Sequence, residues 1–488
     1  MNGPIRHLAG VIFVAFAVLV GAVTYLQVIR GPDYRDDPRN LRVATGRAGK
    51  ERGTIITADG VLVARSIADP NDPQLFARAY PEGESYAHVV GYATLIFGAS
   101  GIEQTRSAAL VSNRDATISG VLNAILGGDI RPQGLRLSLV HDLQQSAVAA
   151  LGDQHGAVVA LDPDTGAVLA MVSNPGFDPA VLQGRDAGPA GNALDADPDE
   201  PLRNRAVNAT YPPGSVFKII TAASALEAGV AGGGTTFADP PTLELPGSTA
   251  TISNYDGGVC GNGDTVTFTQ AFVSSCNTTF GALGMQVGAD QLVATAEAFG
   301  FNQEIPFDLD TLPSAIPAAA SFANDLPGVA QSAIGQRDVR ATPLQIALVG
   351  AAVANQGEIM QPYLVQQVFN SAGQVEAEAV PAVWRRAMSP ASAAALTDLM
   401  EKAVASGTGF RARVPGVRVA GKTGTAEIPG GAPDVWFVGF GPVEAAPGEP
   451  RIVVAVIVED GGNAGVDGTG GSVAAPIAKS VMEAFLDQ

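Results

Sequence analysis

The stretch NATYPPGSVFKIITAASALEA, residues 208–228, gives the strongest indication of how this chain folds. A Pro-Pro-Gly turn precedes Ser215, and apolar residues then recur at helical spacing until Gly229, a residue typical of helix ends. The pattern predicts a helix that begins at Ser215 and carries Lys218 one turn later, on the same face. A hydroxyl and an amine within reach of each other at the positive end of a helix can act as a nucleophile and its base.

A serine at a helix start is more often only a cap, and a single S-x-x-K motif is a weak signal. Two features favour a catalytic role for this serine and lysine. This is the only S-x-x-K in the chain, and the chain has only five lysines, every other basic residue apart from four histidines being arginine. Lysine can lose its proton when it is buried, whereas arginine effectively cannot. The stretch alone leaves the cap and the nucleophile equally open.

Length and composition exclude several classes of protein. A chain of 488 residues predicts two or three domains. The formal net charge of −19 and the lack of any basic run argue against a nucleic-acid partner. The four histidines are scattered, and no H-E-x-x-H motif is present, so we predict no zinc site. A Ser-His-Asp hydrolase is disfavoured because no histidine follows His155.

The N-terminal segment from Leu8 to Ile29 carries no charge and is long enough to span a bilayer. A cleaved signal peptide is the alternative, but it would have a shorter apolar core followed by small residues at the cleavage site. We therefore expect residues 1–7 to form a cytoplasmic tail and residues 8–29 to contact lipid of the cell membrane. The rest of the chain would then lie outside the cytoplasm, although the charge asymmetry of the flanks is faint.

The two cysteines are compatible with that location. Outside the cytoplasm, Cys260 and Cys276 could pair and close a loop of about 16 residues, worth about 3 kcal/mol in the chain-entropy model. Two free thiols are an equally open interpretation.

The rest of the chain divides into two regions. Residues 30–135 predict a linker, a β-hairpin at the Asp59-Gly60 turn and short helices with glycine breaks, and we interpret them as a small, elongated spacer without chemistry. Residues 136–488 predict an α+β domain with one antiparallel sheet covered by helices. Its expected elements are a strand and helix in 135–152, a hairpin in 157–172, loops over 183–200 and 229–262, helix–break–helix in 266–288, helices in 341–355, 389–406 and 473–486, and strands in 416–428, 434–442 and 451–461.

Two further motifs lie downstream of Ser215. Ser275-Cys276-Asn277 is the only S-x-N in the chain, and Lys422-Thr423-Gly424, followed by Thr425, is the only K-T-G. Each has a simpler explanation, since Ser275 and Asn277 could cap a helix and Lys422 could be a solvated strand residue. S-x-x-K, a serine–asparagine motif and K-T-G in this order are together a signature of penicillin-binding proteins and class A β-lactamases.

The chain resembles the class B penicillin-binding proteins, the membrane-anchored D,D-transpeptidases of bacterial wall synthesis, most closely their shorter actinobacterial division-type members. YPPGSVFK, SCN, KTGTAE and WFVGFGP are similar to the catalytic-domain motifs, and RGTI with Asp59-Gly60 and Gly101-Ile102-Glu103 to those of the spacer. The resemblance implies the penicillin-binding/β-lactamase-like transpeptidase fold with an all-helical subdomain. The spacer of roughly 100 residues is small, so the partner contacts of longer relatives are not carried over.

The resemblance also implies roles for the motif residues. Ser215 would attack the carbonyl between the last two D-alanines of a peptidoglycan stem peptide, and a neutral Lys218 would take its proton. Ser275 would relay a proton to the leaving amine, and Asn277 would hold the donor peptide and the Lys218 amine. The remaining roles are an oxyanion hole from the backbone N–H groups of Ser215 and Thr425, and binding of the terminal carboxylate by Lys422, Thr423, Gly424 and Thr425.

A β-lactam imitates the D-Ala-D-Ala end and should acylate Ser215. The resemblance also implies that no metal or organic cofactor is needed. The resemblance further suggests a membrane glycosyltransferase of the shape, elongation and division type as a partner. The alternatives are a D,D-carboxypeptidase or β-lactamase, in which water resolves the acyl-enzyme, a β-lactam sensor of the same fold, and a non-enzymatic wall scaffold. The sequence does not identify the acceptor amine or distinguish division from elongation.

Overall fold

The computed structural model describes residues 2–26, 30, 50–68, 70, 76–94, 96–111, 131–183, 187–446 and 448–487. The predictions for the last residues of the membrane segment (27–29), for nearly all of the linker (31–49) and for the spacer residues 112–130 lie outside the described residues.

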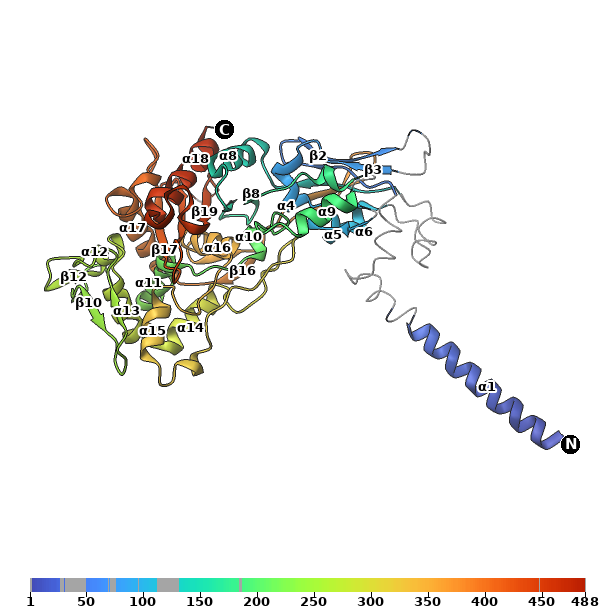
Figure 1. The fold of residues 1–488 in the computed structure, drawn as a ribbon, viewed down its shortest axis with the longest axis horizontal. Helices are drawn as coiled ribbons and strands as arrows, with labels where there is room; N and C mark the ends of the chain where they lie inside the picture. Colours follow the sequence, from blue (N-terminus) through green and yellow to red (C-terminus); the bar gives the residue numbers. More distant parts are fainter. Residues whose placement is uncertain are drawn as a thin grey trace.

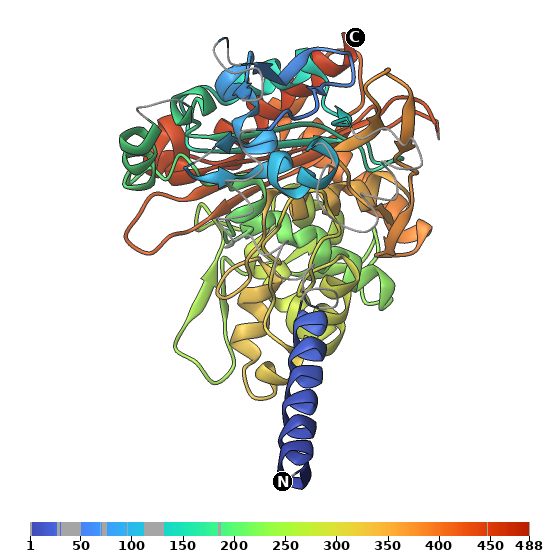
Figure 2. The same ribbon diagram turned by 90° about the vertical axis from the view of Figure 1, so that its right-hand side faces the viewer.

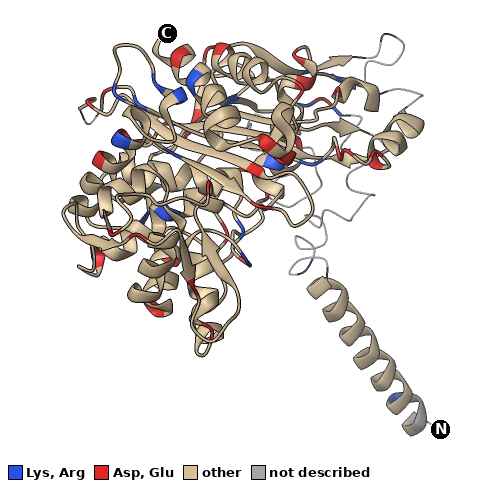
Figure 3. Ribbon diagram, turned by 60° about the vertical axis from the view of Figure 1, so that its left-hand side comes forward, with Lys and Arg blue, Asp and Glu red and all other residues tan. Residues whose placement is uncertain are grey.

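The N-terminal helix α1 (Asn2–Thr24) stands apart from the folded body in Figures 1 and 2. Its segment Arg6–Thr24 has a mean hydropathy of 2.3 and is not buried against the rest of the protein. By length and composition it can cross a membrane, and no other described helix meets the same criteria. In Figure 3 charged residues are scattered over the folded body, whereas Arg6 is the single charged residue of α1.

A five-stranded antiparallel sheet forms the centre of the larger region, in the order β17-β18-β19-β7-β8. Every residue of β7, β18 and β19 is buried, because helices cover both faces of the sheet. α8 and α18 pack on one face and α16, whose residues are all buried, packs on the other (Figure 1). The predicted antiparallel sheet covered by helices is confirmed. The bounds are β7 (Gly156–Leu161), β8 (Val168–Asn174), β17 (Ala420–Ala426), β18 (Asp434–Gly441), β19 (Ile452–Val458), α8 (His141–Leu151), α16 (Pro343–Ala354) and α18 (Ala475–Leu486).

A second, mainly helical layer lies below this sheet in Figure 1. It contains the predicted helix–break–helix, now α12 and α13, and α13 packs on α11 and α15. The segment 229–262, expected as loops, contributes three short strands to two ribbons, because its turns bring threonine-rich pieces side by side. The bounds are α11 (Lys218–Glu227), α12 (Phe268–Val273), α13 (Asn277–Val287), α14 (Ala289–Ala298), η5 (Ala319–Phe322), α15 (Leu326–Ala333), α17 (Pro390–Ala405), η6 (Phe410–Ala412), β9 (Thr236–Ala238) with β12 (Thr265–Thr267), and β10 (Thr242–Glu244) with β11 (Thr251–Ser253).

The prediction of a loop over residues 183–200 is wrong, because Ala187–Asp195 form the helix α9. The segment is rich in alanine, and its proline lies in the first turn, where a helix tolerates it. Gly191 lies against the ring of Phe97, where a Cβ atom would come within 2.2 Å of the ring. Packing against the N-terminal region therefore favours a helix that the glycine content alone argued against.

The N-terminal region is built on a six-stranded sheet in the order β15-β14-β6-β1-β2-β3. The predicted β1–β2 hairpin is confirmed, with Ile55 paired to Ala64. Strands β14 and β15 come from more than 200 residues further along the chain, and β14 pairs with β6. The sheet thus joins residues on both sides of the predicted boundary at 135. The bounds are β1 (Ile55–Ile56), β2 (Leu62–Ala68), β3 (Phe76–Ala79), β6 (Gly134–Leu137), β14 (Val365–Phe369) and β15 (Val375–Glu378).

Short elements complete the N-terminal region and the connections between the two layers. They are η2 (Gly83–Tyr86), α4 (Ala87–Val90), β4 (Ala93–Thr94), β5 (Gly98–Ala99), α5 (Gly101–Thr105), α6 (Ser107–Leu110), η3 (Pro179–Leu182), α10 (Arg205–Asn208), η4 (Gly214–Phe217), β13 (Glu358–Met360), β16 (Val383–Arg386), η7 (Glu459–Asp467) and η8 (Gly470–Ala474).

The two spacer motifs meet in a buried ion cluster. Glu103 accepts hydrogen bonds from Arg52 Nε at 2.6 Å and from Arg78 Nε at 2.5 Å, and none of the three side chains is more than 3% exposed. Arg52 opens the RGTI motif and Glu103 closes Gly-Ile-Glu, so these motifs hold the short elements of the spacer together. Buried charges are tolerated only when they are paired in this way.

Candidate active site

Ser215 lies in η4, one turn of 3₁₀ helix directly before α11. The predicted helix start is confirmed, with the difference that the α-helix itself begins at Lys218. Ser215 is partly exposed and lines a cavity of about 1040 Å³, together with Ser275, Asn277 and Thr425. A nucleophile needs this combination of a fixed backbone and an accessible side chain.

Two glycines let the serine turn press against strand β17. Gly214 has a positive φ of 51°, and a Cβ atom there would lie 2.8 Å from the carbonyl oxygen of Thr425. A Cβ atom on Gly424 would lie 2.9 Å from the carbonyl oxygen of Pro213. Side chains at these positions would force the turn and the strand apart, so both glycines serve the approach of Ser215 to the K-T-G strand.

Lys218 is fully buried and points to the SCN motif. Its Nζ donates hydrogen bonds to the carbonyl oxygen of Ser275 at 2.6 Å and to Oδ1 of Asn277 at 2.7 Å, and lies 3.4 Å from Ser275 Oγ. Burial, followed by the charge of Lys422, holds the pKa of Lys218 well below its usual value. A neutral amine that uses both N–H groups in these short bonds keeps its lone pair free to accept a proton.

Lys422 is also fully buried and reaches the same hydroxyl from β17. Its Nζ donates to Ser275 Oγ at 2.7 Å and to the carbonyl oxygen of Thr423 at 3.1 Å. Burial lowers the pKa of Lys422 to about 7. Ser275 therefore lies between two amines, and its backbone has the uncommon positive φ of 62°. Residues in such conformations cluster at functional sites.

Asn277 begins α13, and its side chain connects the helix to the ribbon β10–β11. It accepts from Lys218 and donates Nδ2 to the carbonyl oxygen of Ser253 at 2.9 Å. Neither Ser275 nor Asn277 caps the helix through its side chain. Asn254 does so instead, because its Oδ1 accepts from the backbone N–H of Asn277 at 2.9 Å and of the next residue at 3.2 Å. Sequence reasoning missed Asn254, since nothing in its local context indicates a contact more than 20 residues away.

The three residues after Lys422 lie on β17. Thr423 and Thr425 line the cavity, and Gly424 lies between them on the strand. The hydroxyls of Thr423 and Thr408 are hydrogen-bonded at 2.6 Å, and Thr425 Oγ1 accepts from the backbone N–H of Gly470 at 3.4 Å. Thr408 and the cavity-lining segment Thr469–Ser472 were missed as site residues, although both lie in Gly-Thr-Gly sequences that could have drawn attention.

Cys260 and Cys276 are joined by a disulfide in the structure. Both line the cavity, and the bond ties the SCN turn to the preceding loop. Asp239 fixes that loop by accepting backbone N–H groups from Cys260, Gly261 and Gly263 at 2.6–3.0 Å. Although Asp239 and the two sulfurs lie close together, the sulfurs are bonded to each other and offer no thiolate to a metal ion.

The three motifs thus converge from separate elements of the fold. Ser215 lines the cavity, whereas the amines of Lys218 and Lys422 are buried behind Ser275 and contact its hydroxyl from two sides. Within the described ranges, neither lysine has a carboxylate in ion-pair distance. An accessible hydroxyl, two desolvated amines and strand-edge threonines form a site suited to acyl transfer through a serine ester.

Comparison with known families agrees with this geometry. Residues 156–483 match the penicillin binding protein transpeptidase domain, and residues 52–135 match the penicillin binding protein A dimerisation domain. The chain therefore belongs to the penicillin-binding protein family, in its class B.

The similarity extends over whole relatives. The chain is 39% identical to the peptidoglycan D,D-transpeptidase PbpA of Mycolicibacterium smegmatis, covering 100% of this chain and 99% of the relative. The ceftriaxone acyl-enzyme complex of penicillin-binding protein A from Mycobacterium tuberculosis is 37% identical, with a TM-score of 0.83 over 91% of this chain and 100% of that one. A D,D-transpeptidase domain from Eggerthella lenta is 39% identical, with a TM-score of 0.79 over 90% of this chain and 99% of that one.

Proposed function

We propose that this protein is a peptidoglycan D,D-transpeptidase that cross-links stem peptides through an acyl-enzyme on Ser215. The observation that carries the proposal is the pair of buried amines, Lys218 and Lys422, that meet at the Ser275 hydroxyl behind the cavity that Ser215 lines. The relatives named D,D-transpeptidase, and the neighbour solved as a β-lactam acyl-enzyme, support the same chemistry.

In the first half-reaction, Ser215 Oγ attacks the carbonyl carbon of the penultimate D-alanine while the Lys218 amine takes the hydroxyl proton. The C–N bond to the last D-alanine then breaks, and the proton passes from Lys218 through Ser275 Oγ to the leaving amine. Desolvation supports this role, because a lysine that stayed charged could not act as a base. D-alanine leaves, and the donor peptide remains as an ester on Ser215.

In the second half-reaction, the amine of a second stem peptide attacks the ester carbonyl. Its proton passes by the same route back to Ser215, and the new amide bond is the cross-link. We assign the oxyanion hole to the backbone N–H groups of Ser215 and Thr425, since the glycine contacts bring turn and strand together there. Thr423 and Thr425, with Gly424 between them and Lys422 behind, would bind the terminal carboxylate, and Asn277 would hold the donor amide.

The remaining assignments follow from the same proposal. Residues 1–7 would lie in the cytoplasm, 8–29 would cross the cell membrane once, 30–135 would form the spacer, and 136–488 would form the transpeptidase domain outside the cytoplasm. The Cys260–Cys276 disulfide supports an oxidising location. β-Lactams would acylate Ser215, and a membrane glycosyltransferase of the shape, elongation and division type would supply the glycan strands.

Fluorescent penicillin and a peptide donor test the proposal on the full chain in detergent. We expect a long-lived adduct on Ser215, found by peptide mass spectrometry, that Ser215→Ala abolishes. Ser274→Ala is the matched control, since Ser274 also lines the cavity but bonds only to the carbonyl of Gln270. With a donor ending in D-Ala-D-Ala and an acceptor amine, we expect the aminolysis product. Hydrolysis alone would indicate a carboxypeptidase, and rapid loss of the penicillin adduct would indicate a β-lactamase.

A further inference from the structure

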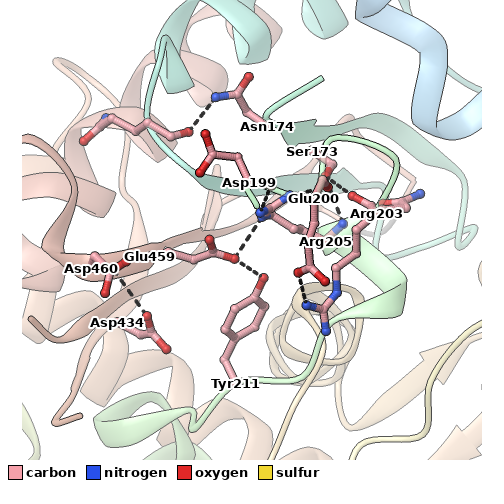
Figure 4. Close-up of polar contacts among 12 residues, drawn as sticks. Ser173, Asn174, Asp199, Glu200, Arg203, Arg205, Tyr211, Asp434, Glu459 and Asp460 are labelled. Carbon is pink, nitrogen blue, oxygen red and sulfur yellow. Dashed lines mark hydrogen bonds and ion pairs between the residues drawn. The ribbon is translucent and has the colours of Figure 1, made fainter. Parts of the chain in front are cut away.

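A polar network of Arg205, Tyr211 and Glu459 lies outside the three motifs of the candidate site (Figure 4). Glu459 follows β19 directly, and its Oε1 accepts two hydrogen bonds, from Tyr211 Oη at 2.5 Å and from Arg205 Nε at 2.9 Å. The Arg205 side chain is 5% exposed and that of Glu459 is 20% exposed. None of these three residues belongs to the S-x-x-K, SCN or K-T-G motifs.

The other contacts of Arg205 fix the carboxylate in place. Its Nη1 donates to the carbonyl oxygen of Glu200 at 3.2 Å, and its Nη2 donates to that of Asp199 at 2.8 Å. The guanidinium therefore has a defined orientation toward Glu459. Burial and the neighbouring Glu459 raise the pKa of Tyr211, so its phenol keeps its proton and acts as a donor. The result is a rigid hydrogen-bonded chain from Arg205 to Tyr211.

Tyr211 begins the turn that carries Ser215, and the chain between them has little freedom. The backbone of Tyr211 exchanges hydrogen bonds with Ala341 at 3.0 and 2.8 Å. The next carbonyl, of Pro212, accepts from Trp436 Nε1 at 3.0 Å, and the backbone N–H of Gly214 donates to Gly335 at 2.9 Å. The bond from Tyr211 Oη to Glu459 adds a side-chain anchor at the start of this hydrogen-bonded turn.

Glu459 also begins the segment 459–472, whose last residues reach the cavity. Two residues later, the backbone N–H of Gly461 donates to the carbonyl oxygen of Pro433 at 2.6 Å. The segment ends at Thr469–Ser472, which lines the cavity, and Gly470 donates to the hydroxyl of Thr425. Glu459 thus connects two pieces that reach the cavity, the serine turn through its bond to Tyr211 and the 459–472 segment through its own backbone.

We infer that Glu459 is a positioning residue for the proposed acylation of Ser215, because its carboxylate holds Tyr211, and with it the nucleophile turn, in register with β17. The inference rests on the proposed function. Misplacing reacting atoms by about 1 Å can cost about 10²-fold in rate. Glu459 itself does not contact the substrate, and its effect passes through Tyr211.

The opposite end of β19 provides a matched control. Arg451, directly before this strand, forms an ion pair with Asp164 whose side chains are 9% and 22% exposed, close to the values for Arg205 and Glu459. The seven residues of β19 lie between Arg451 and Glu459, and the eight extended steps from one to the other span about 26 Å. Asp164→Asn therefore removes a comparably buried ion pair far from the serine turn.

The experiment compares Glu459→Ala, Glu459→Gln, Tyr211→Phe, the double variant Tyr211→Phe/Glu459→Ala and Asp164→Asn. The limiting acylation rate and the affinity of the preceding non-covalent complex are measured with fluorescent penicillin, and Tm is measured beside them. We expect Glu459→Ala and Tyr211→Phe each to slow acylation about 10–100-fold with affinity changed less than about twofold. The double variant should be no slower than the slower single variant, since both act on one contact.

Glu459→Gln keeps an acceptor oxygen for Tyr211 but loses the charge that pairs with Arg205. It should recover most of the acylation rate while Tm stays low, and Asp164→Asn should lower Tm without slowing acylation. The inference would be overturned if the rate losses of Tyr211→Phe and Glu459→Ala multiplied in the double variant, or if Asp164→Asn slowed acylation to the same extent. If Glu459→Ala does not fold, Tyr211→Phe, which removes only a hydroxyl, decides the question.

Hydrogen exchange separates this inference from the proposed function. Amides of residues 214–217 should exchange faster in Glu459→Ala and Tyr211→Phe than in the wild type, but not in Asp164→Asn. If the wild type is not acylated at Ser215, the proposed function is refuted. The exchange result would still test whether Glu459 fixes the serine turn. Unchanged exchange together with unchanged acylation would refute the positioning role alone.

Discussion

Two clusters of buried cations, one in the spacer and one behind the cavity, are held in opposite ways. In the spacer, the guanidinium groups of Arg52 and Arg78 both donate to Glu103. Behind the cavity, the amines of Lys218 and Lys422 are at least as deeply buried, and within the described ranges neither has a carboxylate partner. Their hydrogen-bond partners are two carbonyl oxygens, an amide oxygen and a hydroxyl.

The difference distinguishes buried cations that stabilise the fold from buried amines that can act in the reaction. Arginine keeps its proton in any protein environment, so its burial requires an anion, and the paired cluster stabilises the spacer. An unpaired lysine lowers its own cost of burial by losing its proton, which makes it a base. Four experiments test this contrast, and they follow in order of the expected effect.

The largest effect should come from Lys218. Lys218→Arg keeps a cation that cannot lose its proton, and Lys218→Met keeps a neutral side chain without a lone pair. Both should slow acylation by fluorescent penicillin about 10²–10⁴-fold, the usual contribution of a general base. A Lys218→Arg variant that is folded and reacts at the wild-type rate would show that no neutral amine is needed.

Removing the Glu103 carboxylate from the spacer cluster should lower stability without slowing acylation. Glu103→Ala leaves two buried guanidinium groups unpaired, so we expect a loss of about 3–5 kcal/mol in the free energy of unfolding. Urea unfolding of the full chain measures this loss. The acylation rate of the fraction that remains folded should match the wild type, and a proportionate loss of rate would mean that the spacer cluster also shapes the active site.

The pH dependence of stability should reveal Lys422. Its pKa is about 7 in the folded protein and 10.5 in a solvated chain, so between these values the unfolded state binds more protons and stability rises with pH. The slope is at most about 1.4 kcal/mol per pH unit for one proton. Lys422→Met should reduce this slope when urea unfolding is compared at pH 7, 8 and 9, whereas parallel curves would contradict the lowered pKa.

The smallest effect should come from an exposed pair. Lys402 and Asp398 form an i,i+4 ion pair on α17, with both side chains about half exposed. Asp398→Asn should cost only about 0.3–0.5 kcal/mol and should leave acylation unchanged. Addition of salt should reduce this small difference further, because solvent screens the pair. A loss of unfolding free energy as large as that of Glu103→Ala would show that burial does not explain the difference between the exposed pair and the spacer cluster.

Much of the fold could be predicted because its elements have local signatures. The hairpin around Asp162–Gly166, the buried helix α16 and the strands β17 to β19 all follow periodic apolar patterns or turn residues. The strands β14 and β15 were not predicted, because all their residues except Val365 are half exposed or exposed and the partner of β14, β6, is distant in sequence. The helix α9 was missed because packing on Phe97 outweighs its glycine content.

The candidate site shows the same division. Ser215, Ser275 and Lys422 were identified because each lies in a motif that occurs once, in a known order. Asn254 and Glu459 carry no such signal, and the Gly-Thr-Gly sequence around Thr408 is weaker than these motifs; the structure shows their contacts with distant segments.

The sequence by itself determined the membrane-length apolar helix, the antiparallel core and the three motifs, because helix and strand periodicity and motif spacing are properties of neighbouring residues. Only the tertiary structure decided that two amines meet at one hydroxyl, that one disulfide joins the SCN turn to its neighbouring loop, and that Glu459 bonds to Tyr211 at the start of the serine turn. These outcomes depend on the burial and mutual approach of segments far apart in the chain. Burial shifts a lysine pKa only after the whole core has formed around it.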